Sequence, residues 1–253
     1  MISLQHRSNE AYEIIELCLL AGKIMLQSGA ETYRVEDTMT RIASSYGIDQ
    51  SHSFVTPTGI IFSIDGMDPT KLIRISERST DLQKVTLVNS ISRQISSGDI
   101  SITEAIKQLK EIETSNLAYP IWIQILAAAI ASGCFLIMFQ GGWYDFLPAF
   151  ISGGVGFACL VYFHRLVQVK FVAEFLASLL IGILAILFVT FEIGQELDKI
   201  IIGSVMPLVP GLLITNAVRD LIVGHLVSGI SKGAEAFLTA LAIGTGIAVV
   251  LSF

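Results

Sequence analysis

Three polar side chains near the end of an apolar stretch are the residues of this sequence best placed to bind a solute. Arg219 and Asp220 follow Asn216 by three and four residues, so on a helix the three share one face. An arginine can hold a carboxylate through two parallel hydrogen bonds, and an asparagine can orient it. An aspartate can either fix the arginine or carry a proton. The spacing therefore predicts a site for a small carboxylate, with Asp220 as a coupling residue.

A break in the apolar stretch precedes these residues. Residues 206–211 read MPLVPG, and Pro207 and Pro210 each lack an N–H and clash with the preceding turn. We expect one half-helix at residues 200–205 and a second that starts near Gly211, where free N–H groups and the helix dipole favour a carboxylate. Pro207, Pro210 and Gly211 are thus expected at the substrate site, because broken helices mark transport sites. A proline kink in an ordinary span is the alternative.

Two further carboxylates lie in apolar surroundings. Glu174 and Glu235 fall near the ends of apolar runs. If they point inward, they are candidates to carry coupling protons or to pair with Arg219. The alternative is that both are interfacial residues in contact with water.

Composition divides the chain into two halves. Of the 253 residues, 53% are hydrophobic and 15% are charged, which is unusual for one soluble globule. Most of the charged residues lie before Pro120, so residues 1–119 are expected to form a soluble domain and residues 120–253 a membrane domain. Neither half is basic enough to indicate nucleic-acid binding. Residues 1–16 carry several charges and no long apolar core, so we expect a cytoplasmic amino-terminal domain.

The first half is expected to have an α+β fold. Hydrophobic periodicity, turn residues and caps predict helices and strands. In order, they are helices at 9–27 and about 30–46, strands at 53–56, 59–64 and 70–76, and helices at 82–97 and 102–114. Asp81 is the expected cap of the third helix, and Ser101 with Glu104 forms a capping box for the fourth.

The most distinctive run of the first half is SGAETYRVED at residues 28–37. We expect Glu31, Tyr33 and Arg34 to contact the membrane domain. A solvated first turn, stabilised by the helix dipole, explains Glu31 equally well. The sequence has no phosphate-binding loop or nucleophile motif, and its three isolated cysteines fit neither a disulfide framework nor a zinc site. We therefore expect no enzyme activity, cofactor or metal, and interpret the cysteines as core residues.

The second half predicts five membrane spans, each long enough to cross a bilayer. They are residues 121–139, 146–163, 171–191, 200–223 (the broken one) and 234–253. Basic residues gather in the segments 164–170 and 219–232, which the positive-inside rule assigns to the cytoplasm. The expected protein is thus a multi-pass plasma (inner) membrane protein with its carboxyl terminus outside.

Several motifs together resemble the threonine/serine exporter family. They are residues 28–37, the turn at Thr56 to Gly59, Gly98 with Glu104 and Ala105, and PLVPG at 207–211 followed by Asn216, Arg219 and Asp220. The resemblance covers nearly the whole chain. Full-length members join this unit to a second set of spans, and this chain ends at Phe253. It therefore resembles the larger subunit of the split form, which works with a small multispanning membrane subunit.

The resemblance implies an exporter subunit. Split exporters are associated with dicarboxylates such as succinate, and fused members export threonine and serine, which is the alternative substrate class. We find no ATP-hydrolysing motif, so export is expected to draw on the membrane potential or a proton gradient. The expected partners are the carboxylate solute, the small subunit and the lipid bilayer, and a homo-oligomer stays open. A membrane-anchored hydrolase-like domain and a channel or structural subunit are the rival interpretations.

Overall fold

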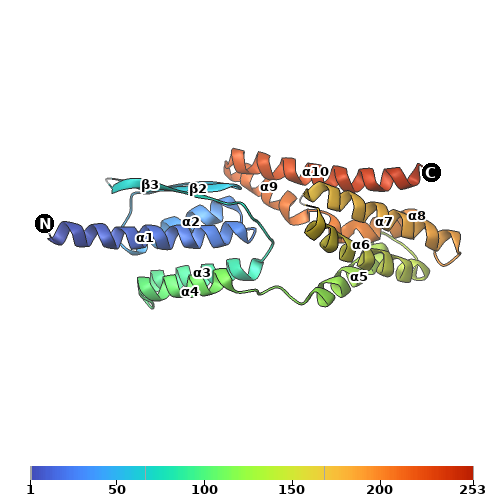
Figure 1. Cartoon of the computed structure of the whole chain (residues 1–253), viewed down its shortest axis with the longest axis horizontal. Coiled ribbons are helices and arrows are strands. Elements are labelled where there is room, and N and C mark those ends of the chain that lie inside the picture. The colour runs from blue at the N-terminus through green and yellow to red at the C-terminus, as the bar shows by residue number, and fades with distance from the viewer. Residues whose placement is uncertain (1, 66, 168, 253) are drawn as a thin grey trace. The chain divides into compact units, whose positions relative to one another are not determined.

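The structure is a computed structural model that describes residues 2–65, 67–167 and 169–252, with the side chains of residues 2–10 and 67–69 left undescribed. The chain divides into two compact units (Figure 1). The first unit contains the chain up to Ala118 together with Leu212–Gly233, and the second contains Tyr119–Gly211 and the chain from Ala234 onward. The first unit is therefore built from two segments that are far apart in sequence.

The first unit combines helices with a small sheet. Its elements before Ala118 are α1 (Ile2–Gln27), α2 (Thr32–Ser45), β1 (Ser51–Thr56), β2 (Gly59–Ile64), β3 (Met67–Arg74), α3 (Leu82–Ser97) and α4 (Ile102–Thr114). The three strands are antiparallel and lie in the order β1-β2-β3. In Figure 1 the sheet covers one side of α1 and α2, while α3 and α4 cover the other.

The predicted helix ends are set by local residues. Asp81 caps α3 by accepting a hydrogen bond from Lys84 N at 3.1 Å, and Gly98 ends that helix in the left-handed region with φ of 76°. Ser101 Oγ accepts from Glu104 N at 3.3 Å at the start of α4. The side chain of Glu104 accepts from Gln108 at 3.0 Å. Of the two hydrogen bonds of the expected capping box, the structure therefore has the one that Ser101 accepts.

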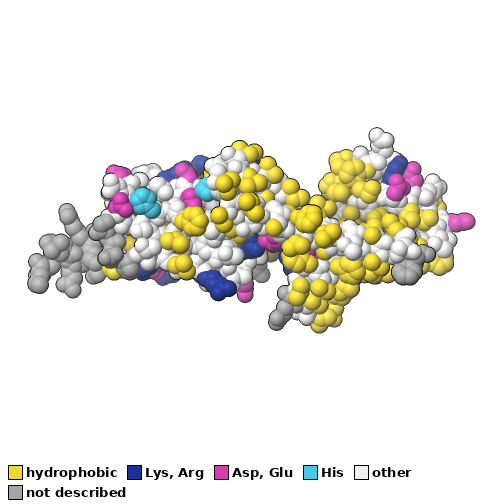
Figure 2. Space-filling view, turned by 90° about the horizontal axis from the view of Figure 1, so that it is seen from above, with side chains coloured by type: hydrophobic (Ala, Val, Ile, Leu, Met, Phe, Trp, Pro, Cys, Tyr) yellow, Lys and Arg dark blue, Asp and Glu magenta, His cyan; other side chains and the backbone are white. Residues whose placement is uncertain are grey.

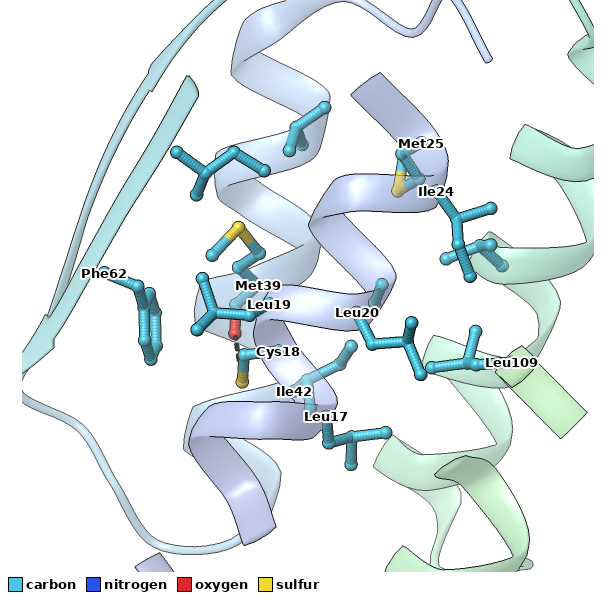
Figure 3. Packing of buried hydrophobic residues seen from close by; sticks show 14 of the residues in the cluster. Leu17, Cys18, Leu19, Leu20, Ile24, Met25, Met39, Ile42, Phe62 and Leu109 are labelled. Atoms are coloured by element: carbon cyan, nitrogen blue, oxygen red, sulfur yellow. Dashed lines mark hydrogen bonds between the residues drawn. The ribbon is translucent and has the colours of Figure 1, made fainter. Parts of the chain in front are cut away.

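The hydrophobic core of the first unit is centred on α1 (Figure 3). Leu17 and Met25 are fully buried in this core, which also contains Phe62 of the sheet and Leu109 of α4. Cys18 donates to the Met39 carbonyl at 3.5 Å, and burial raises the pKa of its thiol to about 12. This cysteine is thus an unreactive core residue, as expected.

Helices make up the second unit. They are α5 (Ile121–Met138), η1 (Trp143–Asp145), α6 (Phe146–Leu166), α7 (Lys170–Thr190), α8 (Leu197–Val205) and η2 (Met206–Leu208), and the unit also takes in most of α10 (Leu226–Leu251). Helix α9 (Gly211–Val223) belongs almost wholly to the first unit. Within the described residues, four helices are long and apolar enough to cross a membrane, or up to five if α8 to η2 and α9 are counted as one interrupted span.

Apolar side chains cover much of the surface of the second unit (Figure 2). Trp122, Ile130, Tyr162 and Leu187 are among the exposed large hydrophobic residues. Exposure on this scale is expected for helices that face lipid. Cys134 of α5 is also exposed, so the interpretation of all three cysteines as core residues is wrong for that one.

Some element boundaries differ from those expected. Helix α1 begins at Ile2 rather than near residue 9, α2 begins at Thr32, and β3 ends at Arg74. The largest difference is in α10, which begins at Leu226 instead of residue 234. Gly224, with φ of 97°, makes the turn from α9 into α10. Lys232 therefore lies within a helix and not in a loop.

Candidate functional site

A cluster of ion pairs joins the loop before α2 to α9 and the start of α10, all within the first unit. The chain reverses after α1 at Gly29, whose φ of 87° favours glycine. The Gly29 carbonyl accepts a hydrogen bond from Asn216 Nδ2 of α9 at 3.0 Å. Glu31 then takes an extended conformation as the first residue before α2 and makes no capping bond with its own side chain. The free N–H groups at the start of α2 therefore need an acceptor from elsewhere.

Asp220 of α9 supplies that acceptor. One carboxylate oxygen accepts from Thr32 N at 3.1 Å, and the other accepts from the Thr32 hydroxyl at 2.9 Å. Lys232 of α10 donates to the same carboxylate at 2.7 Å and to the Thr32 hydroxyl at 3.2 Å. The carboxylate thus sits at the positive end of the α2 dipole with a lysine beside it.

Both members of this ion pair are buried, unlike Arg219 beside them. The side chains of Asp220 and Lys232 are 0% and 5% exposed. Removing one member of such a pair leaves an uncompensated charge in the interior, which costs about 3–5 kcal/mol. The pair therefore fixes α9 and α10 to the start of α2 and is closed to a solute in this conformation.

Arg219, next to Asp220, is accessible. Its guanidinium forms an ion pair with Glu31, and Arg34 lies 3.2 Å from the other oxygen of Glu31. The Arg219 side chain is 47% exposed, whereas that of Glu31 is 10% exposed. Tyr33 is half-buried on the first turn of α2. Arg219 and Arg34 therefore share the carboxylate of Glu31, and the guanidinium of Arg219 is a cation at the surface that already holds one carboxylate.

A second contact joins the sheet to the same helices. Glu36 of α2 accepts from Val55 N at 2.9 Å and lies 3.9 Å from His225 Nδ1. Ser228 of α10 donates to the Val55 carbonyl at 3.0 Å. Burial raises the pKa of Glu36, and the nearby Asp220 adds to this, while the Val55 N–H and His225 act in the opposite direction.

Glu174 and Glu235 meet in the second unit. Lys170 lies 3.0 Å from Glu235 and 4.0 Å from Glu174, and Thr239 donates to Glu174 at 3.4 Å. Glu174 is 4% exposed, and its Oε2 has no hydrogen-bond partner among the described residues. The two glutamates therefore share Lys170.

The residues of the proline-rich break belong to the second unit. Helix α8 ends at Val205, and the 3-10 turn Met206–Leu208 contains Pro207. Pro210 comes just before α9, and Gly211 N donates to the Val209 carbonyl at 2.8 Å. The Gly211 N–H is therefore engaged within the break. The expected site residues thus fall into two groups, with Asn216, Arg219 and Asp220 in the first unit.

Sequence reasoning missed four residues of this cluster. Thr32 and Glu36 lie in the 28–37 run but received no role, and His225 and Lys232 were taken as parts of a connecting segment. Lys232 did carry a signal. It lies between Gly229 and Gly233, in a stretch whose apolar residues continue the helical pattern of α10. A lysine inside a largely apolar helix is a candidate for pairing with an acid.

Helices that are long and apolar enough to cross a membrane are what a multi-pass membrane protein requires, and the described part of the chain has four or up to five of them. A family model described as "Putative threonine/serine exporter" matches residues 16–253. The chain therefore belongs to the threonine/serine exporter family, whose members are transporters and not enzymes. Membership of this family excludes the alternative of a membrane-anchored hydrolase-like domain.

Relatives of two kinds resemble the chain. A probable succinate transporter subunit of Klebsiella aerogenes is 27% identical, with 98% of this chain and 97% of the relative covered. A relative of the same name from Escherichia coli is 26% identical over 94% of both chains. The threonine/serine exporter of Corynebacterium glutamicum is 25% identical over 94% of this chain but 51% of its own length. No solved structure matches the chain.

Proposed function

We propose that this chain is one subunit of a secondary-active exporter that moves a small carboxylate solute, such as succinate, out of the cytoplasm. Two relatives of nearly equal length carry the name probable succinate transporter subunit. A relative named threonine/serine exporter is about twice as long. These lengths support a split exporter in which a second, small membrane subunit provides the remaining spans.

The accessible Arg219 is the observation that carries the proposal. It is half-exposed and already holds a carboxylate, that of Glu31. Lys232 is buried against Asp220 and is not available to a solute in this conformation. We infer that Glu31 holds the position that a substrate carboxylate takes during transport, and that Asn216 orients the substrate once it has released the Gly29 carbonyl.

Exchange between Glu31 and a substrate carboxylate links binding to the movement of α9. While Arg219 is paired with Glu31, α9 is tied to the start of α2; when a substrate takes the guanidinium, that tie is released. The Asp220–Lys232 pair and the Asn216 bond hold the remainder of the contact. The proposed cycle thus uses the first unit as a gate that is shut while Arg219 is paired with Glu31.

Coupling is assigned to the buried carboxylates. Glu174 has an oxygen without a partner among the described residues and shares Lys170 with Glu235, so a proton or cation that arrives there would neutralise excess negative charge. Asp220 is a second coupling candidate because substrate exchange at Arg219 alters the charge beside it. In the proposed topology α8, η2 and α9 form one broken span around Pro207, Pro210 and Gly211, the amino terminus is cytoplasmic and the carboxyl terminus is outside.

Counterflow in proteoliposomes that contain both subunits tests the role of Arg219. Arg219→Lys keeps the charge but loses the planar fork, and Arg219→Gln loses both. We expect the apparent affinity for succinate to fall about ten- to a hundredfold in the glutamine variant, which corresponds to roughly 1.5–3 kcal/mol for a charged hydrogen bond, and by less in the lysine variant.

Glu31→Gln provides the matched test. If Glu31 competes with the substrate for Arg219, its removal tightens apparent substrate affinity, whereas a purely structural Glu31 would leave the affinity unchanged or weaken it. Arg165→Lys, an exposed position at the end of α6, is the control and should behave as the parent protein. Unchanged affinity in a correctly inserted Arg219→Lys protein, together with unchanged affinity in Arg219→Gln, would remove Arg219 from the substrate site. A panel of succinate, threonine and serine in the same assay decides between the dicarboxylate and amino-acid alternatives.

A further inference from the structure

A polar cavity of about 250 Å³ lies in the first unit, outside the Arg219 cluster. It is bordered by the end of α1, the loop between β3 and α3, the start of α3 and the end of α4, and its charged and hydroxyl-bearing lining residues are Ser28, Glu77, Arg78, Ser79, Lys84 and Glu113. Pockets for drug-sized ligands run from about 300 to 1,000 Å³. This cavity is therefore of a size for a small metabolite.

The charges that line the cavity are not all committed to one another. Glu113 is paired with Lys23 at 2.7 Å, so its charge is compensated from outside the lining. Lys84 donates to the main-chain oxygen of Glu113 at 3.0 Å, and that acceptor does not cancel the ammonium charge. Glu77 adds a carboxylate to the lining. Arg78 also lines the cavity but is engaged in a contact of its own, so the cavity offers a cation at Lys84 and an anion at Glu77 to an incoming molecule.

A ligand that matches both charges carries a carboxylate and an ammonium group. A dicarboxylate would place its second negative charge near Glu77 or Glu113, and an amine without a carboxylate would leave Lys84 without a partner. We propose that this cavity binds a small α-amino acid as its zwitterion, with Lys84 on the carboxylate and Glu77 on the ammonium group. Its chemistry therefore differs from that of the exposed Arg219.

The cavity shares a segment of chain with the ion-pair cluster. Ser79 N donates to the Gln27 carbonyl at 2.8 Å, and Asp81 N donates to the Ser28 carbonyl at 3.0 Å. The next residue, Gly29, accepts the hydrogen bond from Asn216 of α9. A ligand that fastens residues 77–84 to the end of α1 therefore acts on the loop that holds Asn216 and Glu31. Binding here stands independently of transport, and its use as a regulator of export rests on the proposed function.

Calorimetric titration of the full-length protein in detergent tests the site, with L-serine, serinamide and succinate as probes. We expect serine to bind, and both serinamide, which has no carboxylate, and succinate, which has no ammonium group, to bind at least about tenfold more weakly. Glu77→Gln and Lys84→Gln should each weaken serine binding at least about tenfold. Asp49→Asn and Lys107→Gln change exposed charges outside the cavity lining and should leave it unchanged.

Two further measurements separate this site from the transport site. Arg219→Gln should retain full serine binding in the same titration, even where it has lost transport. Hydrogen exchange should slow at residues 27–31 when serine is added to the parent protein but not to Glu77→Gln, which, as an exposed residue, is not expected to disturb folding. Succinate binding as tight as that of serine, loss of serine binding in Arg219→Gln, or equal serine affinity in the parent, Glu77→Gln and Lys84→Gln proteins would each overturn the proposal.

Discussion

At the scale of single residues, the burial of the Asp220–Lys232 pair determines how the loss of either side chain affects stability. Both side chains are enclosed, and Thr32 shares its hydrogen bonds between them. Such a pair is worth little relative to well-packed apolar residues, but each member is costly to leave without the other. The stability of the first unit is therefore more sensitive to loss of one partner than to loss of both.

We predict that Asp220→Asn and Lys232→Met each destabilise the protein by about 3–5 kcal/mol, and that the double variant recovers much of this loss. Thermal unfolding of the detergent-purified protein measures the effect, with an expected fall in Tm of roughly 10 °C for each single variant. Asp49→Asn, at an exposed position, is the control. Additive losses in the double variant would show that the two side chains do not act as a pair.

Glu36 predicts a dependence of stability on pH. Because burial raises its pKa above the ordinary glutamate value, the native protein holds this proton more tightly than the unfolded chain does. The contribution of Glu36 to stability is therefore full at pH below the ordinary value and is lost as pH rises through the native pKa. Glu36→Gln keeps the acceptor for Val55 N but has no charge to bury, so it should unfold at a higher temperature than the parent at neutral pH.

The pH profile supplies the check. The difference in Tm between Glu36→Gln and the parent should shrink as pH is lowered to the ordinary glutamate range. Glu111→Gln changes an exposed glutamate of α4 and should follow the parent at every pH. A constant difference between Glu36→Gln and the parent across this range would contradict the assignment.

The residues of the cluster show what sequence reasoning can and cannot reach. Asn216, Arg219 and Asp220 were found because helical spacing places them on one face. Their partners were not found, because Thr32 lies 188 residues before Asp220 and no local pattern encodes such a contact. The part of the site that depends on tertiary packing was therefore beyond prediction from one sequence, while the part carried by one helix was not.

At the scale of elements, local signals predicted most helices closely. The caps at Asp81 and Ser101 and the glycine at Gly98 set the ends of α3 and α4 as expected. The start of α10 was misplaced because Ser228, Ser231 and Lys232 resemble a polar connection. Ser228 instead bonds to Val55, and Lys232 bonds to Asp220 and Thr32. Packing overrides a local polar signal in such cases.

Two glycines of α10 differ in how closely a neighbouring helix approaches them. A Cβ at Gly246 would lie 2.6 Å from the Phe175 carbonyl oxygen of α7, whereas a Cβ at Gly244 would meet nothing within 4 Å. We expect Gly246→Ala to lower the Tm of the detergent-purified protein by several degrees, since the two helices must separate. Gly244→Ala should be neutral or slightly stabilising, because alanine favours a helix over glycine. Equal Tm values for the two variants would mean that α7 and α10 are not in close contact at Gly246.

At the scale of the whole molecule, the family and its relatives support a protein that needs a partner. The threonine/serine exporter of Corynebacterium glutamicum is about twice as long as the part that this chain matches, and two relatives are named as transporter subunits. In the proposed topology, the broken span around Met206–Leu208 corresponds to one half of the paired broken helices that many transporters use. We therefore predict that the chain alone, reconstituted in proteoliposomes, gives no succinate counterflow, and that adding the small membrane subunit restores it.

The test needs a comparison of inserted amounts. Equal quantities of the chain, with and without the second subunit, should be verified by gel before flux is compared. Flux by the chain alone at the level of the pair would show a self-sufficient homo-oligomer instead.

The bond between Thr32 and Lys232 joins residues 200 positions apart, and this separation sets an order of events during synthesis. The core built on α1 to α4 is complete once residues up to 118 have left the ribosome, but the acceptor for Thr32 N arrives only after α9 has been made. Until then the first turn of α2 must rely on water or on a chaperone, because closing so long a loop is slow. A chain truncated before residue 220 would thus retain the folded core of the first unit but leave the start of α2 without its acceptor, and the cluster would mark whether translation had reached the final helix.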